Sequence, residues 1–123
     1  MQTEQLIAIV REALDDVKAR DVEVIDVRGK SSITDFMMIA SGTSKRHVVS
    51  LAQAVSDKVK QSDIEPIGTE GQSDGDWVLV DLGELVVHIM MPDARSYYDL
   101  ERLWRFDSSE DEVVEANAGV QKG

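Results

Sequence analysis

The sequence has no cysteine among its 123 residues, so a disulfide framework and a thiolate zinc site are both excluded. Its only histidines, His47 and His88, fall in a predicted helix and a predicted strand, so no helical histidine pair for zinc exists. Without thiols, serine is the candidate nucleophile. Ser44 could combine with His47 and Asp35, but nothing around it resembles a nucleophile elbow.

Basic residues are also scarce, because 13 Lys and Arg against 24 Asp and Glu give a net charge of −11. This charge repels phosphate backbones and predicts little direct contact with nucleic acid, whereas it favours a basic protein partner. No apolar run approaches the ~20 residues that span a bilayer. The N-terminus has neither a basic region nor a long apolar core, so no signal peptide is predicted. We therefore expect a soluble, cytoplasmic protein with no membrane contact.

Length and composition predict one domain followed by a tail. The apolar fraction of 42% is sufficient for a hydrophobic core, and residues 1–105 match the usual domain size of ~100–150 residues. Beyond Arg105 acidic residues dominate, and the chain ends in small and polar residues. We predict that residues 106–123 form an acidic, poorly ordered tail with room for a short helix at 110–116.

The centre of the predicted domain is a β-hairpin. Its strands, Trp77–Leu82 and Leu85–Met91, are joined by a Gly83-Glu84 turn. Both strands are apolar on both faces, which indicates that both faces of the sheet are covered. Pro92 ends the second strand, and Asp93 is predicted to cap a helix that runs to Trp104.

The remaining elements follow from hydrophobic periodicity. We predict helices at Thr3–Arg20, capped by Thr3, and at Ser44–Gln61. Edge strands are predicted at Val22–Val27 and Ile64–Gly71, and a strand buried on both faces at Asp35–Ser41. The predicted fold class is α/β: a mixed sheet of about five strands with helices packed mainly on one face.

One pattern favours an enzyme. The segment Gly42–Ser44 lies between a strand and a helix, where free N–H groups of a helix N-terminus bind phosphate. Asp74, Asp76 and Asp81 could supply carboxylates for magnesium in nucleotidyl transfer. The segment has neither a Walker lysine nor a Rossmann glycine triplet, and two of these acids fall in a loop. A nucleotidyltransferase-like enzyme that uses the Gly42–Ser44 turn and Asp81 is therefore the alternative hypothesis.

The third helix is short, and its apolar residues form no single stripe. We expect one side to dock on the domain, comprising Tyr97, Leu100, Leu103 and Trp104. The outward side then comprises Arg95, Tyr98 and Arg102.

An exposed patch should therefore remain on the hairpin and this helix. Exposed aromatic residues with arginine characterise protein-binding hot spots. The residues expected to be core are Val78, Val80, Val87 and Ile89. Those expected to contact a partner are Trp77, Leu82, Met91, Arg95 and Tyr98. The alternative is that all of them are core and that a homodimer covers the rest.

Several of these segments also form a family pattern between about Leu6 and Trp104. They are Asp35-Phe36-Met37-Met38-Ile39-Ala40-Ser41-Gly42-Thr43-Ser44 through His47-Val48, Gly71, Asp76-Trp77-Val78-Leu79-Val80-Asp81-Leu82-Gly83-Glu84, Val86-Val87-His88-Ile89, and Arg95 with Tyr98-Asp99-Leu100-Glu101-Arg102-Leu103-Trp104. In order and spacing the chain resembles the Iojap family, the bacterial ribosomal silencing factors.

The resemblance implies a nucleotidyltransferase-like fold without catalysis, hence no enzyme and no cofactor. It implies binding to the large ribosomal subunit through ribosomal protein fourteen, at the face where the small subunit docks. Occupancy there would block subunit joining and repress translation, mainly when nutrients are scarce, and self-association into a homodimer is also implied. The family surface carried over comprises Trp77, Asp81, Leu82, Gly83, His88, Met91, Arg95 and Tyr98.

Overall fold

The computed structural model describes residues 2–106 and contains a five-stranded mixed sheet. The strands are β1 (Arg20–Asp26), β2 (Phe36–Ser41), β3 (Gly68–Glu70), β4 (Trp77–Asp81) and β5 (Leu85–Met90). The helices are α1 (Thr3–Asp16), α2 (Lys45–Gln61), α3 (Pro92–Tyr98) and α4 (Leu100–Phe106). The strand order is β1-β2-β5-β4-β3, with β2 and β5 parallel and the other pairs antiparallel. The predicted α/β class is confirmed, and β1 and β3 are the edges, as predicted.

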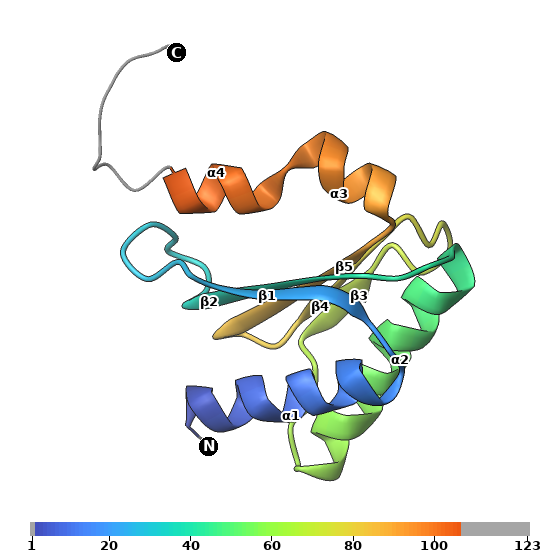
Figure 1. The fold of residues 1–123 in the computed structure, drawn as a ribbon. Coiled ribbons are helices and arrows are strands. Elements are labelled where there is room, and N and C mark those ends of the chain that lie inside the picture. The colour runs from blue at the N-terminus through green and yellow to red at the C-terminus, as the bar shows by residue number, and fades with distance from the viewer. Residues whose placement is uncertain (1, 107–123) are drawn as a thin grey trace.

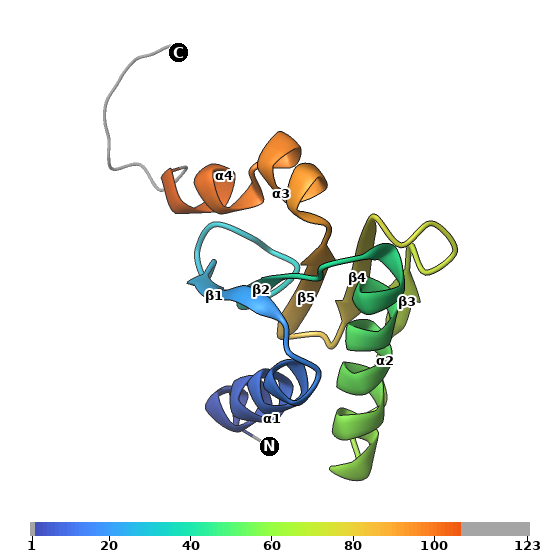
Figure 2. The same cartoon turned by 45° about the vertical axis from the view of Figure 1, so that its right-hand side comes forward.

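The helices lie on both sides of the sheet. Figures 1 and 2 show α1 and α2 together on one face and α3 and α4 on the other. The larger core lies under α1 and α2, where Val78, Val80, Val87 and Ile89 are fully buried, as predicted. A smaller cluster lies under α3 and α4 and is centred on Met37, Ile39 and Met90.

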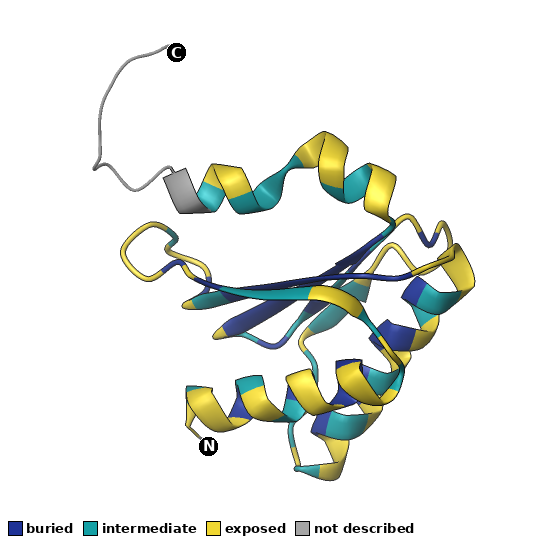
Figure 3. Ribbon diagram, in the orientation of Figure 1, coloured by how far each residue is buried: buried dark blue, intermediate teal, exposed yellow. Residues whose placement is uncertain are grey.

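Because both faces are covered, the central strands are apolar throughout. Every residue of β5 is buried, and β2 is buried except at Phe36. Figure 3 shows these buried strands between the two helical layers, whose outer sides are exposed. The sequence patterns of β2 and β5 therefore predicted their surroundings correctly, whereas one face of β4 is only half-buried.

The first helix begins at Thr3, as predicted, but it ends four residues earlier than predicted, at Asp16. Its N-cap is Gln2 rather than Thr3, and the backbone N–H of Gln2 donates to Oε1 of Gln5 at 3.1 Å. The helix ends at Asp16 because Lys18 adopts a left-handed conformation with φ of 63°. Arg20, predicted to be the last helical residue, begins β1 instead.

The third helix is interrupted, which the sequence pattern did not predict. Asp99 has φ of 51° and ψ of 51°, so α3 ends there and α4 begins in a new direction. Asp is one of the few non-glycine residues that adopt this conformation readily. The N-cap is Met91 with Pro92 in the first turn, so the predicted cap at Asp93 is wrong.

The predicted acidic tail, 106–123, lies outside the described residues apart from Phe106, where α4 ends. The short helix considered at 110–116 also lies outside them. No helix in the part of the chain that the structure describes has the length and apolarity to cross a bilayer.

Candidate binding surface

The outer part of the sheet is incompletely covered on the side of α3 and α4. These helices pack over β1, β2 and β5 through Ala94, Leu100 and Trp104. On β4, Trp77, Leu79 and Asp81 point to the same side and are only half-buried. Together with Tyr98 at the end of α3, they form a half-open patch that we call the Trp77 surface.

The Trp77 indole is held between two other aromatic rings. Its Nε1–H donates to Nδ1 of His88 at 2.9 Å. Its ring centroid lies 4.8 Å from that of Tyr98, with the planes tilted by 46°. The ring of Tyr98 in turn contacts that of Tyr97 edge-on, with the two ring centroids 5.0 Å apart. Tyr98 itself is 53% exposed. The surface thus presents a preformed aromatic group to solvent.

His88 lies beneath this surface rather than on it, because the residue is only 6% exposed. Burial lowers the pKa of His88 from 6.5 to about 4, so its imidazole is neutral near pH 7. A neutral imidazole has one acceptor nitrogen, and here that nitrogen, Nδ1, accepts the hydrogen bond from the indole N–H. The prediction that His88 directly contacts a partner does not fit this burial.

The β4–β5 turn forms the far corner of the surface. Oδ1 of Asp81 accepts from the backbone N–H of Gly83 at 2.9 Å, and Gly83 has φ of 87°, which favours glycine. Leu82 is only 7% exposed, so its predicted outward position is wrong. Leu82 points to the α1 and α2 side and belongs to the main core.

Arg95 also turns inward, contrary to prediction. Its Nε and Nη2 donate to the two carboxylate oxygens of Glu101 at 2.9 and 2.8 Å, and Nη1 donates to Oγ of Ser41. The side chain is 11% exposed, and the hydrogen bonds to Glu101 are the main cause that raises its pKa. Arg95 therefore links α3 to α4 and to the end of β2.

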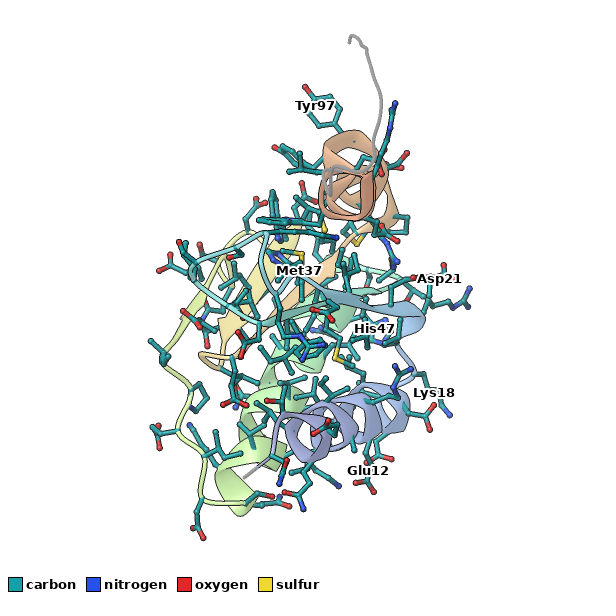
Figure 4. The ribbon with its side chains drawn as sticks, turned by 90° about the vertical axis from the view of Figure 1, so that its left-hand side faces the viewer. Glu12, Lys18, Asp21, Met37, His47 and Tyr97 are labelled. Atoms are coloured by element: carbon teal, nitrogen blue, oxygen red, sulfur yellow. The ribbon has the colours of Figure 1, made fainter. Side chains whose placement is uncertain are left out.

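The outward side of α3 and α4 also differs from prediction because of the break at Asp99. Tyr97 and Leu103, expected to dock, are 83% and 55% exposed. Figure 4 shows Tyr97 projecting away from the sheet. Leu100 and Trp104 dock as predicted, and Arg102 is exposed as predicted. Met91 is half-buried against the main core.

Sequence reasoning missed two residues at this surface. Leu79 lies between Trp77 and Asp81 on β4, and strand alternation alone could have identified it. Ile67 is 71% exposed, and its Cδ1 lies 3.4 Å from where a Cβ on Gly83 would be. It precedes a three-residue strand whose register the sequence did not indicate.

The alternative enzymatic site is not assembled. Ser44 caps α2, and the N–H of Thr43 donates to Nδ1 of His47, so the turn's polar groups already serve the fold. The turn follows β2 at the end of the sheet where Trp77 begins β4. Asp81 lies four residues along β4, ~13 Å away at the usual rise of a strand. Within residues 2–106, no group of three or more His, Asp or Glu side chains could hold a metal ion.

Comparison with known proteins places these features in a family. The family model described as ribosomal silencing factor during starvation matches residues 1–122. A ribosomal silencing factor from Haemophilus influenzae is 48% identical over 80% of this chain and 97% of its own length. A mouse protein named mitochondrial assembly of ribosomal large subunit protein 1 is 32% identical over 94% of this chain and 50% of its own length.

A solved structure agrees with the sequence matches. The crystal structure of a protein from Chromobacterium violaceum superposes with a TM-score of 0.83 at 36% identity. The match covers 99% of this chain and 98% of that protein. The resemblance drawn from the sequence motifs is thereby confirmed. The chain belongs to the ribosomal silencing factor family, and its role is that of a ribosome-associated regulator of translation.

Proposed function

We propose that this protein represses translation by occupying the large ribosomal subunit. It binds through ribosomal protein fourteen of that subunit and sterically prevents the small subunit from joining, mainly under nutrient limitation. Family membership supports a ribosomal target, and the name of the mouse relative refers to the large subunit. No covalent bond is made or broken in this mechanism, so no catalytic residue and no cofactor is required.

The observation that carries this proposal is the Trp77 surface. It presents the rings of Trp77 and Tyr98, whose centroids already lie 4.8 Å apart, on the same side of the sheet as Asp81. Ordered aromatic side chains bury a large area at little cost in side-chain entropy, which is why they dominate interface hot spots. The net charge of −11 favours a basic partner surface.

The predicted site residues then have two kinds of role. Direct contact is assigned to the half-buried or exposed residues of the Trp77 surface and its turn, namely Trp77, Asp81, Gly83 and Tyr98, and to the half-buried Met91 directly after β5. Supporting roles behind the surface are assigned to Leu82, His88 and Arg95, since each is largely buried. Leu79 and Ile67 extend the contact area along β4 and past the turn.

Sedimentation of the protein with purified large subunits tests this proposal. Tyr98→Ala removes an exposed ring, so we expect binding to weaken by about 2 kcal/mol while thermal stability changes little. The matched control is Tyr97→Ala, which removes a neighbouring and more exposed tyrosine that projects away from the sheet. The control should retain most of the binding.

Three outcomes would contradict the proposal. Equal loss of binding in both tyrosine variants would place the interface on the outer side of α3 instead. Co-sedimentation with joined ribosomes as readily as with free large subunits would remove the occlusion mechanism. Light scattering of the free protein, repeated with large subunits present, would reveal a homodimer that never opens and never binds.

A further inference from the structure

We propose that His88 is a positioning residue that acts through Trp77: it fixes the orientation of the indole ring that the partner meets, without touching the partner itself. This inference rests on the proposed function for its consequence in binding. It replaces the direct role that the family resemblance implied for His88 with an indirect one.

The strand register explains why these two side chains meet. In the β4–β5 ladder, His88 lies opposite Leu79, and Trp77 lies opposite Met90. Trp77 and His88 are therefore diagonal neighbours on one face, a separation that aromatic side chains can reach. Their ring centroids are 5.7 Å apart, and Nε1 of the indole lies 2.9 Å from Nδ1 of the imidazole.

The indole is constrained from two directions. The hydrogen bond to His88 fixes its N–H edge from within the sheet, and the Tyr98 ring contacts it from α3. A tryptophan side chain has two rotatable bonds, so these two contacts are enough to select one orientation. An indole with no acceptor beneath it would turn its N–H toward water and leave the Tyr98 ring.

The buried position of His88 makes it a dependable acceptor. Its 6% exposure places the imidazole out of reach of a docked protein, so its side chain meets the surface only through Trp77. Burial also disfavours the protonated form, which would have no acceptor nitrogen. The required tautomer carries its proton on Nε2 and leaves Nδ1 free to accept.

The hydrogen bond can be detected directly in the unmodified protein. In the ¹⁵N-labelled chain, an N–H···N bond gives a scalar coupling between Nε1 of Trp77 and Nδ1 of His88. We expect this coupling, together with a non-protonated Nδ1. Trp77→Phe should remove one indole resonance and leave that of Trp104, which assigns the signal. A protonated Nδ1 without the coupling would overturn the proposal whether or not the variants fold.

The positioning role is tested by a matched pair of variants. His88→Asn retains an acceptor near the position of Nδ1, whereas His88→Phe fills the site without one. We expect His88→Phe to weaken binding to large subunits about fivefold to tenfold, the usual worth of one hydrogen bond, and His88→Asn to restore most of it. In the Trp77→Phe background, His88→Phe should have no further effect on binding.

The variants also define the results that would overturn the positioning role of His88. Equal losses for His88→Asn and His88→Phe, or a loss for His88→Phe that persists in the Trp77→Phe background, would overturn the positioning role. Ile25→Val, a buried change on the same sheet face in β1, controls for general loosening of the core. If the unmodified protein fails to bind large subunits, the proposed function fails. The scalar coupling between Nε1 of Trp77 and Nδ1 of His88 still decides whether His88 holds the indole ring.

Discussion

At the scale of single residues, Arg95 and Tyr98 differ from each other although both were predicted to face outward from α3. They lie one turn apart, yet Tyr98 is 53% exposed, whereas the Arg95 side chain is 11% exposed. Helical spacing could not separate them, because the partners of Arg95, Glu101 and Ser41, come from α4 and β2. Arg95, a charged residue within the family pattern, therefore supports the Trp77 surface from behind and does not form part of its exposed area.

A pH-dependent stability follows from His88. Its pKa is 6.5 when unperturbed and about 4 in the folded protein, because the imidazole is buried. The unfolded chain therefore gains a proton at higher pH than the folded chain. The contribution to the free energy of unfolding is complete above pH 6.5 and declines by on the order of 3 kcal/mol as the pH falls toward 4. Urea denaturation across this range measures the decline.

The His88→Asn variant isolates this effect from the titration of the many carboxylates. Asparagine does not take up a proton in this range, so the variant should lose stability less steeply between pH 6.5 and 4. Identical pH profiles for the two proteins would mean that folding does not lower the pKa of His88.

At the scale of elements, the pairing of α3 with α4 depends on a few contacts. Asp99 breaks the helix, and the paired hydrogen bonds from Arg95 to Glu101 then set the direction of α4. The backbone carbonyl of Trp104 accepts from Nζ of Lys30, which ties α4 to the loop after β1. Leu100 and Trp104 complete the attachment by packing on the sheet.

Glu101→Gln should loosen this attachment. The substitution removes the charge that pairs with the mostly buried Arg95 guanidinium, and we expect a loss of about 1–2 kcal/mol in stability. Hydrogen exchange should accelerate in α4 before it does in β5. Arg102→Ala, an exposed change on the same helix, serves as the control. Unchanged exchange in α4 would show that apolar packing alone holds it.

The turn before β4 offers a second comparison. A Cβ on Gly71 would lie 2.1 Å from the carbonyl oxygen of Trp77, whereas a Cβ on Gly29 would meet nothing within 4 Å. Both glycines have positive φ, and the backbone strain of placing alanine at positive φ is therefore common to both substitutions. We expect Gly29→Ala to cost about 1 kcal/mol and Gly71→Ala about 3 kcal/mol or more. Thermal denaturation compares them, and equal costs would refute the close approach.

Sequence patterns predicted correctly those elements whose surroundings can be inferred from the residues of the element itself. The strands Phe36–Ser41 and Leu85–Met90 are apolar on both faces, and that property alone indicates cover on both sides. The hydroxyl cap of α2 at Ser44 is likewise local. The break at Asp99, the inward turn of Arg95 and the burial of Leu82 depend on contacts with distant segments. No pattern of neighbouring residues could therefore predict these three features.

At the scale of the whole molecule, the net charge of −11 acts on association more than on the final contacts. If the partner surface is basic, added salt should slow association by screening the long-range attraction, while dissociation changes little. Rapid-mixing kinetics with large subunits at increasing ionic strength measures both rates. A salt effect confined to dissociation would instead indicate a buried charge pair at the interface.

The parallel pairing of β2 with β5 has a consequence for how the chain reaches its native state. The outer pairs, β1 with β2 and β4 with β5, join neighbouring segments and can form early. The middle pair joins Ile39 to His88, so it must close a connection that runs through α2, β3 and β4. Loop closure over such a distance slows folding, and the middle of the sheet should therefore be the last part to assemble.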